Sequence, residues 1–155
     1  MKITIIGPGK LKEKYLKDGI AEFKKRLTTY TKLEIIEVPD EKCPENLSHA
    51  DMEIVKKREG EKILSKINLS SFIITLELEG KQLTSEELSK KIEDITVRGF
   101  SHITFIIGGS LGLHKIVRDK SHFKLAFSKM TFPHQLMKLI LIEQIYRSFR
   151  MLVSN

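Results

Sequence analysis

The sequence contains few residues of the kinds that cross-link a chain or carry it through a membrane. Its 155 residues include a single cysteine, Cys43, and no tryptophan, so no disulfide can form within the chain. The longest apolar runs, such as 139–142, have only a few residues, whereas a membrane-spanning helix needs roughly 20. The first residues also lack the charged and then apolar order of a signal peptide. We therefore expect a soluble protein of the reducing cytoplasm.

Ligands at metal-binding spacing are also missing. His49 lies near Cys43, but no further His or Cys follows at the spacing of a zinc site. His102 begins one expected strand and His122 precedes another, and we interpret both as edge or core residues. We expect no bound metal.

The charge is basic and unevenly distributed. The net charge is +7, from 27 basic and 20 acidic side chains. Residues 10–32 hold eight Lys or Arg against three acids and residues 98–155 hold nine against two, whereas residues 33–97 hold nine against fifteen. Two basic ends around an acidic centre favour a polyanionic partner, and nucleic acid is the leading candidate. The alternative is that the lysine-rich helices are simply solvated.

The pattern of the chain is that of an α/β protein. A length of 155 residues with 41% hydrophobic content is enough for one core, so we expect one domain over 1–155. Short β-branched runs alternate with helix-period segments, which predicts a mostly parallel sheet flanked by helices. The expected strands are 3–6, 33–38, 72–78, 102–107 and 123–127, and the expected helices are 11–30, 48–67 (after the N-cap Ser48), 84–98 (opened by a Thr84/Glu87 capping box), 113–119 and a last one with Pro133 in its first turn.

Three glycines follow the fourth expected strand. Gly108, Gly109 and Gly112 allow a tight turn and would let backbone groups approach a flat ligand. Their spacing fits neither G-x-G-x-x-G nor a Walker A loop, which disfavours dinucleotides and nucleoside triphosphates. The alternative to a binding role is that these glycines only allow the chain to turn after a buried strand. If a ligand fills the space beside Gly108, valine at this position should abolish binding.

Five runs together resemble the ribosomal RNA large-subunit methyltransferase H family of SPOUT enzymes. They are GGSLGL at 108–113, SKMTFPH at 128–134, EQIYR at 143–147, MKITIIGPGK at 1–10 and LELEGK at 76–81. The resemblance implies a SPOUT fold with a C-terminal trefoil knot, which topology rules alone would have disfavoured. It also implies that S-adenosylmethionine binds in the knot. The cofactor-binding residues implied are Leu76, Gly108, Gly109, Phe127, Ser128, Lys129, Met130, Thr131 and Phe132, although Leu76 and Phe132 could instead be ordinary core residues.

The resemblance further implies a substrate: N3 of a pseudouridine (the position 1915 type) in 23S rRNA of the assembled ribosome. Methyl transfer to N3 requires an acceptor for its proton and an aligned substrate. Our candidates are His134 or Glu143 as the proton acceptor and Arg147 as a clamp on a phosphate or a base carbonyl. Glu143 and Arg147 could instead form a surface ion pair, because they stand four apart with the acid first.

The last helix is apolar over most of its circumference, so we expect a homodimer. Members of the family extend beyond this region with a tail that holds a Tyr-His pair and a basic residue and reaches the active site of the dimer, whereas residues 149–155 here read FRMLVSN. A catalytically weak or silent ribosome-binding dimer is therefore one alternative. A flavodoxin-like nucleotide-binding module is another, but GPGK at 7–10 lacks the Ser or Thr of its phosphate loop.

Overall fold

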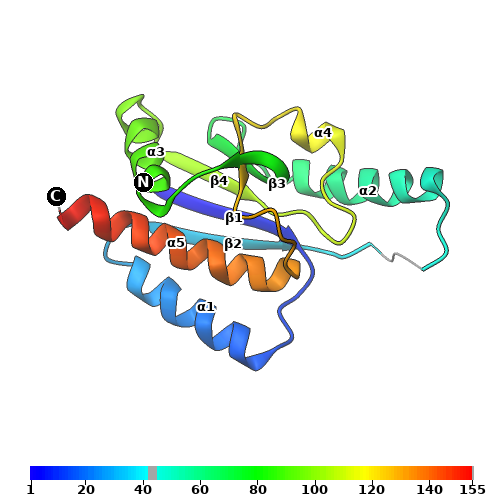
Figure 1. Cartoon of the computed structure of the whole chain (residues 1–155), viewed down its shortest axis with the longest axis horizontal. Helices are drawn as coiled ribbons and strands as arrows, with labels where there is room; N and C mark the ends of the chain where they lie inside the picture. The colour runs from blue at the N-terminus through cyan, green and yellow to red at the C-terminus, as the bar shows by residue number, and fades with distance from the viewer. Residues whose placement is uncertain (42–44, 155) are drawn as a thin grey trace.

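The computed structural model describes residues 1–41 and 45–154 (Figure 1), so Cys43 lies outside the described residues. Within them, strands and helices alternate along the chain, as expected of an α/β protein. In order they are β1 (Lys2–Pro8), α1 (Lys14–Leu27), β2 (Lys32–Val38), α2 (His49–Leu64), β3 (Phe72–Gln82), α3 (Ser85–Val97), β4 (His102–Ile106), α4 (Lys115–Arg118), β5 (Phe123–Ala126) and α5 (His134–Ser154).

The strands form one sheet in the order β2-β1-β4-β3-β5, and every neighbouring pair is parallel. The predicted α/β fold is confirmed. Because all strands run the same way, their carboxyl ends share one edge of the sheet. That edge is where the turns after β3, β4 and β5 can meet.

Strand β3 is longer than predicted and irregular. Leu125 of β5 pairs with both Leu76 and Lys81 of β3, so the register shifts between these two residues. A Cβ atom on Gly80 would lie 2.8 Å from the carbonyl carbon and oxygen of Lys124. Glycine therefore lets the end of β3 return onto β5, a close backbone approach that the alternation of apolar residues could not reveal.

Helices cover both faces of the sheet. The helices α1, α3 and α5 pack on the face that presents Ile3, Ile5 and Phe105, and α2 and α4 pack on the face that presents Ile6 and Ile106. In Figure 1, α5 crosses in front of the strands with α1 below it. Each fully buried isoleucine contributes roughly 1.5–3 kcal/mol of hydrophobic stabilisation. The parallel strands are thus apolar on both faces, as expected when helices flank both.

Local capping signals were reliable, and helix ends were less so. The capping box of Thr84 and Glu87 is present, and Ser48 accepts the N–H of Asp51 at 3.1 Å. The first helix begins at Lys14, three residues later than predicted, and α2 ends at Leu64 rather than 67. The last helix, α5, begins after Pro133, whose carbonyl accepts the N–H of Met137.

The two strand-associated histidines have structural partners, as predicted. Nε2 of His102 lies 2.7 Å from the hydroxyl of Thr4. Nδ1 of His122 accepts the N–H of Ile73 at 2.8 Å, and its ring stacks on Phe72 with centroids 5.0 Å apart. Among the described residues, no group of three His, Cys, Asp or Glu is placed to hold a metal ion. No helix of this part of the chain has the length and apolar character needed to cross a bilayer.

Candidate functional site

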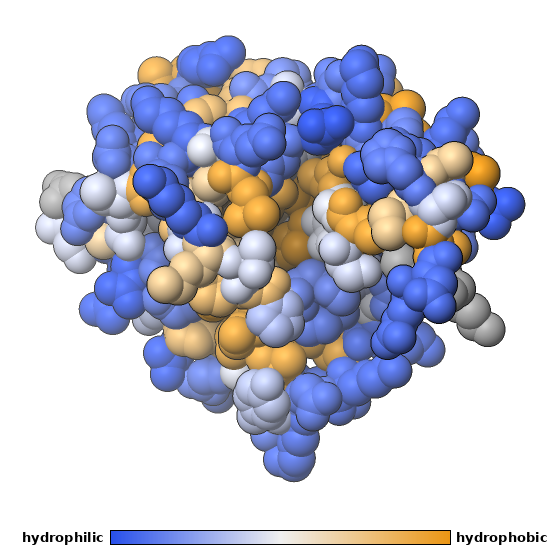
Figure 2. Space-filling model, turned by 45° about the vertical axis from the view of Figure 1, so that its right-hand side comes forward, coloured by the Kyte–Doolittle hydropathy of each residue, from blue (hydrophilic) through white to orange (hydrophobic). Residues whose placement is uncertain are grey.

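A cavity of about 790 Å³ opens at the carboxyl edge of the sheet, and we refer to it as the turn cavity. Figure 2, with this side turned forward, shows apolar side chains gathered around a hollow. Ligands in open α/β sheets bind at such an edge. The walls are formed by residues 76–79 of β3, 107–113 after β4, 125–128 and 130–134 in and after β5, and Lys56, Arg118 and Met137 from helices.

The turn after β4, residues 107–113, depends on its glycines for its own shape, and we call it the glycine turn. The N–H of Gly112 donates to the carbonyl of Gly109 at 3.0 Å, and Gly112 has φ +81°. A Cβ atom on Gly108 would lie 2.9 Å from the carbonyl carbon of Gly112. We expected the space beside Gly108 to be left for a ligand. This was wrong for the space into which a Cβ atom would point, because the backbone of the same turn fills that space.

The segment after β5 supplies apolar side chains to the opening. Phe127 packs against the core, whereas Met130 is 74% exposed and Phe132 is 38% exposed. The hydroxyl of Ser128 accepts the N–H of Met130 at 3.0 Å, which holds the turn in place. Single exposed apolar side chains are common on protein surfaces, so the position of these two in the wall of the turn cavity, rather than their exposure, is what favours a binding role.

The structure brings together nearly all of the predicted cofactor-binding residues, from segments far apart in the sequence. The walls of the turn cavity include Leu76, Gly108, Gly109, Phe127, Ser128, Met130, Thr131 and Phe132. Lys129 is not among the residues that line it. Leu76 is half-buried against the core while also facing the cavity, so the two interpretations of this residue are compatible.

The whole chain, residues 1–155, matches a family model described as "Predicted SPOUT methyltransferase". The chain belongs to this family. It is also similar to proteins named ribosomal RNA large subunit methyltransferase H. The match is 62% identical to that of Finegoldia magna over 98% of this chain and 96% of the relative, and 60% to that of Clostridioides difficile over 97% and 94%. The relative from Shouchella clausii is 59% identical over 98% and 96%. These findings confirm the family assignment.

A solved structure shares the fold at low sequence identity. It is a probable methylase family protein from Haemophilus influenzae, matched with a TM-score of 0.53 and 13% identity over 99% of this chain and 68% of that one. At this identity the likeness supports the SPOUT fold alone. The turn cavity therefore lies within a SPOUT architecture.

The three predicted catalytic residues of this SPOUT protein are divided between two places. His134 lies in the wall of the turn cavity, whereas Glu143 and Arg147 line a second hollow of about 1070 Å³, which we call the helix groove. Its walls come from three helices: Phe23, Arg26, Glu86, Ser89, Lys90, Glu93, Glu143, Tyr146, Arg147, Arg150, Met151, Leu152 and Ser154. Glu143 follows His134 by nine positions along the helix, which corresponds to about 13 Å of rise and, beyond two full turns, roughly half a turn of rotation. One chain therefore cannot join them into a single constellation.

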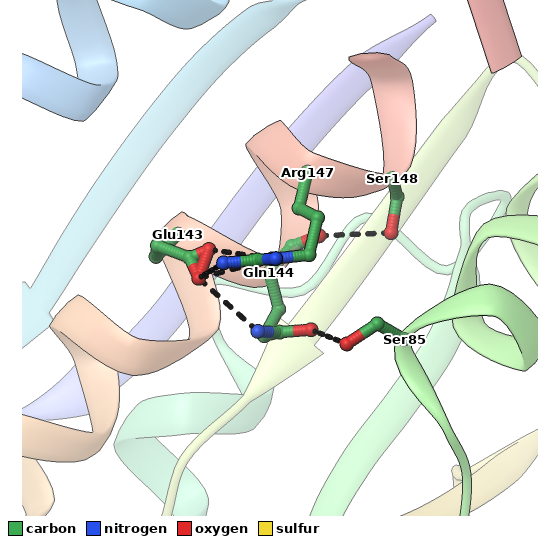
Figure 3. A network of polar contacts seen from close by, with 5 residues as sticks. All are labelled: Ser85, Glu143, Gln144, Arg147 and Ser148. Atoms are coloured by element: carbon green, nitrogen blue, oxygen red, sulfur yellow. Dashed lines mark hydrogen bonds and ion pairs between the residues drawn. The ribbon is translucent and has the colours of Figure 1, made fainter. Parts of the chain in front are cut away.

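The pair in the helix groove is a bidentate ion pair (Figure 3). Nη2 of Arg147 lies 2.9 Å and Nε 3.1 Å from different oxygens of Glu143. The carboxylate raises the pKa of the Arg147 guanidinium. Gln144 donates to Glu143 at 3.2 Å and accepts the hydroxyl of Ser85 at 2.6 Å, which ties the start of α3 to α5. The surface ion pair that we considered is thus present, and the Nε and Nη2 edge of Arg147 is occupied by Glu143.

Sequence reasoning missed the charged residues that helices bring to the turn cavity. Lys56 of α2 and Arg118 of α4 line it beside Glu77 and Glu79. Nε of Arg118 is buried without a hydrogen-bond partner among the described residues. Neither cation lies within a recognisable motif, so only packing could place them. Sequence reasoning also missed Lys138 of α5, which is 1% exposed and faces the sheet but does not line the turn cavity.

Proposed function

We propose that this protein is an S-adenosylmethionine-dependent methyltransferase that modifies N3 of a pseudouridine (the position 1915 type) in 23S rRNA of the assembled ribosome. The observation that carries the proposal is the meeting of three distant segments, after Leu76, Gly108 and Phe127, in one cavity. The relatives' names indicate rRNA of the large subunit as the substrate. We further propose that the knot of the family is present and that residues 1–155 act as one cytoplasmic domain.

The residues of the turn cavity fit the cofactor. Its volume of about 790 Å³ lies within the range of small-molecule sites, roughly 300–1,000 Å³. Leu76, Met130 and Phe132 offer apolar surface for the faces of an adenine, and the glycine turn offers backbone polar groups for its edge. Glu77 and Glu79 lie in the walls together with Lys56 and Arg118, so charged groups of both signs are available to a ligand that carries a sulfonium, an ammonium and a carboxylate.

The protein has to align the substrate and accept one proton. When bound, S-adenosylmethionine supplies an electrophilic methyl group on sulfur. The residues of the turn cavity would hold this methyl group in line with N3, sulfur would leave with the electron pair of its bond to the methyl carbon, and a side chain of the protein would accept the proton that N3 releases. His134 is our candidate acceptor in the turn cavity, with Glu143 the alternative, and Arg147 would hold an RNA phosphate or base carbonyl. Alignment of the reacting atoms provides the rest of the rate enhancement.

We also propose that the active unit is a homodimer. His134 and the pair Glu143–Arg147 lie on different sides of α5, so one chain alone cannot present all three to one nucleotide. A second copy could place its helix groove beside the turn cavity of the first. Tyr146 and Met151 give the groove apolar surface of the kind that subunit interfaces bury.

Titration calorimetry followed by a methylation assay tests the proposal. Binding of S-adenosylmethionine and its demethylated product at one site per chain, together with methyl incorporation at N3 of the pseudouridine in ribosomes, would support it. Cofactor binding without incorporation would favour a catalytically silent ribosome-binding protein. Absence of cofactor binding would overturn the assignment of the turn cavity. Sedimentation analysis at the concentration of the assay would decide whether the active species is a dimer.

A further inference from the structure

Glu59 is a buried carboxylate that sequence reasoning did not single out. It lies in α2, on the face of the sheet opposite α5, and only 8% of its surface is exposed. Burying a carboxylate is unfavourable unless its oxygens find donors. Burial raises the pKa of Glu59, a hydrogen bond from the Gly109 N–H opposes that shift, and the nearby Asp40 and Glu41 add to it. Because the burial of Glu59 is unfavourable by itself, its contact with Gly109 is the feature that its placement would serve.

The contact reaches the glycine turn from behind. The N–H of Gly109 donates to Oε1 of Glu59 at 3.2 Å. A Cβ atom on Gly109 would lie 2.9 Å and 3.0 Å from the two carboxylate oxygens and 3.2 Å from Cγ of Pro8. The carboxylate and the bare backbone therefore fit each other, and a side chain at position 109 would displace Glu59.

The neighbouring residue of α2 holds the other end of the same turn. Gly60 is buried, and a Cβ atom there would lie 3.3 Å from side-chain atoms of Ile116 and Val117 in α4. Helix α4 begins directly after the turn, where the side chain of His114 accepts the N–H of Ile116. Two consecutive residues of α2 thus contact the beginning and the end of the segment 109–117. This arrangement leaves the turn little freedom to move relative to the sheet.

We propose that Glu59 is a positioning residue for the cofactor, acting through the backbone of Gly109 without touching the ligand. This inference rests on the proposed function of the turn cavity. By accepting the Gly109 N–H from behind, Glu59 keeps the turn in the shape in which its remaining backbone groups face the cavity. Preorganisation of this kind improves affinity because the turn does not have to be ordered on binding.

The test compares three substitutions of Glu59 with one control. Glu59→Gln keeps a carbonyl acceptor and the side-chain length, Glu59→Met keeps the length without an acceptor, and Glu59→Asp keeps the charge but withdraws it by one methylene group. Glu61→Met changes an exposed glutamate in the same helix. We expect S-adenosylmethionine, titrated by calorimetry, to bind Glu59→Met and Glu59→Asp about tenfold more weakly. Glu59→Gln should bind within about threefold of the parent protein, and Glu61→Met should match it.

A second measurement does not depend on the cofactor. Exchange of the Gly109 amide hydrogen should accelerate in Glu59→Met and Glu59→Asp but not in Glu59→Gln, because only the first two lose the acceptor. Unchanged affinity in folded Glu59→Asp and Glu59→Met would overturn the inference. If the parent protein binds no S-adenosylmethionine, the proposed function fails instead, and amide exchange still reports whether Glu59 holds the turn.

Discussion

The turn cavity and the helix groove present opposite kinds of surface. The turn cavity is built from backbone turns and apolar side chains after three strands, whereas the helix groove is lined mainly by charged and aromatic side chains of α1, α3 and α5. A backbone-lined cavity can select a small ligand by shape. A groove lined by arginines and a lysine, with three glutamates and two aromatic residues beside them, suits a larger, polar partner. This contrast supports the proposal that the cofactor binds in the turn cavity and that RNA, or a second subunit, binds at the helix groove.

Gly108→Val should give the largest effect and should be confined to the turn cavity. The new side chain would meet the backbone of Gly112, since even a Cβ atom would lie 2.9 Å from it. We expect the affinity for S-adenosylmethionine to fall by at least about 100-fold, because the turn must change shape. Calorimetry measures this. Ala21→Val is the control, because it places a valine at an exposed position of α1 that lines neither hollow, and it should bind normally. Full affinity in folded Gly108→Val would remove the glycine turn from the site.

Arg147→Ala tests whether the helix groove takes part in catalysis. We expect methylation of ribosomes to fall by at least about tenfold, with cofactor affinity unchanged because the groove is separate from the turn cavity. The unfolding temperature should hardly move, since exposed ion pairs contribute little to stability. Lys14→Ala breaks a comparable pair, to Asp18, on α1 and should leave methylation intact. If both variants keep full activity, the Glu143–Arg147 pair is only structural.

Removing Lys12, Lys24 and Lys25 together tests whether the basic N-terminal region, of which Arg26 lines the helix groove, binds RNA. All three lysines are exposed, and none of them lines the groove itself. Ribosome binding should weaken, and the slope of log affinity against log salt should become less negative by roughly 2. Alanines at Lys57, Arg58 and Lys66, which are also exposed, are the control. Equal loss of cofactor affinity in the first variant would instead indicate a structural patch.

Lys138→Met probes α5 between the two sites and should have the smallest effect. Burial lowers the pKa of Lys138, against the attraction of Glu37 and Asp40, and its ammonium has no hydrogen-bond partner in the described part of the chain. The folded protein thus binds this proton less tightly than the unfolded chain, so stability rises with pH up to the ordinary lysine pKa of 10.5. Methionine should stabilise the protein by about 1 kcal/mol at neutral pH.

Urea unfolding between pH 7 and 10 measures this difference. The advantage of Lys138→Met over the parent protein should shrink as the pH rises, because the parent loses its unfavourable buried charge. The exposed Lys17→Met variant should show no such trend. A constant advantage at every pH would mean that packing, rather than the charge, sets the stability at this position.

The alternation of apolar runs, the Thr84 capping box and the motif at 128–134 were sufficient to predict the sheet, most helices and most of the cavity wall. These features depend on residues close together in the sequence. The return of β3 at Gly80, the true neighbour of Gly108 and the separation of His134 from Glu143 were not predictable in this way. Each depends on which backbone segments approach one another across the sheet.

The sequence by itself determined the α/β class and the family and predicted most of the residues that line the turn cavity, because periodicity and short motifs are local properties. Only the tertiary structure decided that α2, from the opposite face of the sheet, supplies Glu59 behind Gly109, and that charged and aromatic residues of three helices form one groove. Packing brings together residues that are distant in the chain, and no spacing along the chain records those distances.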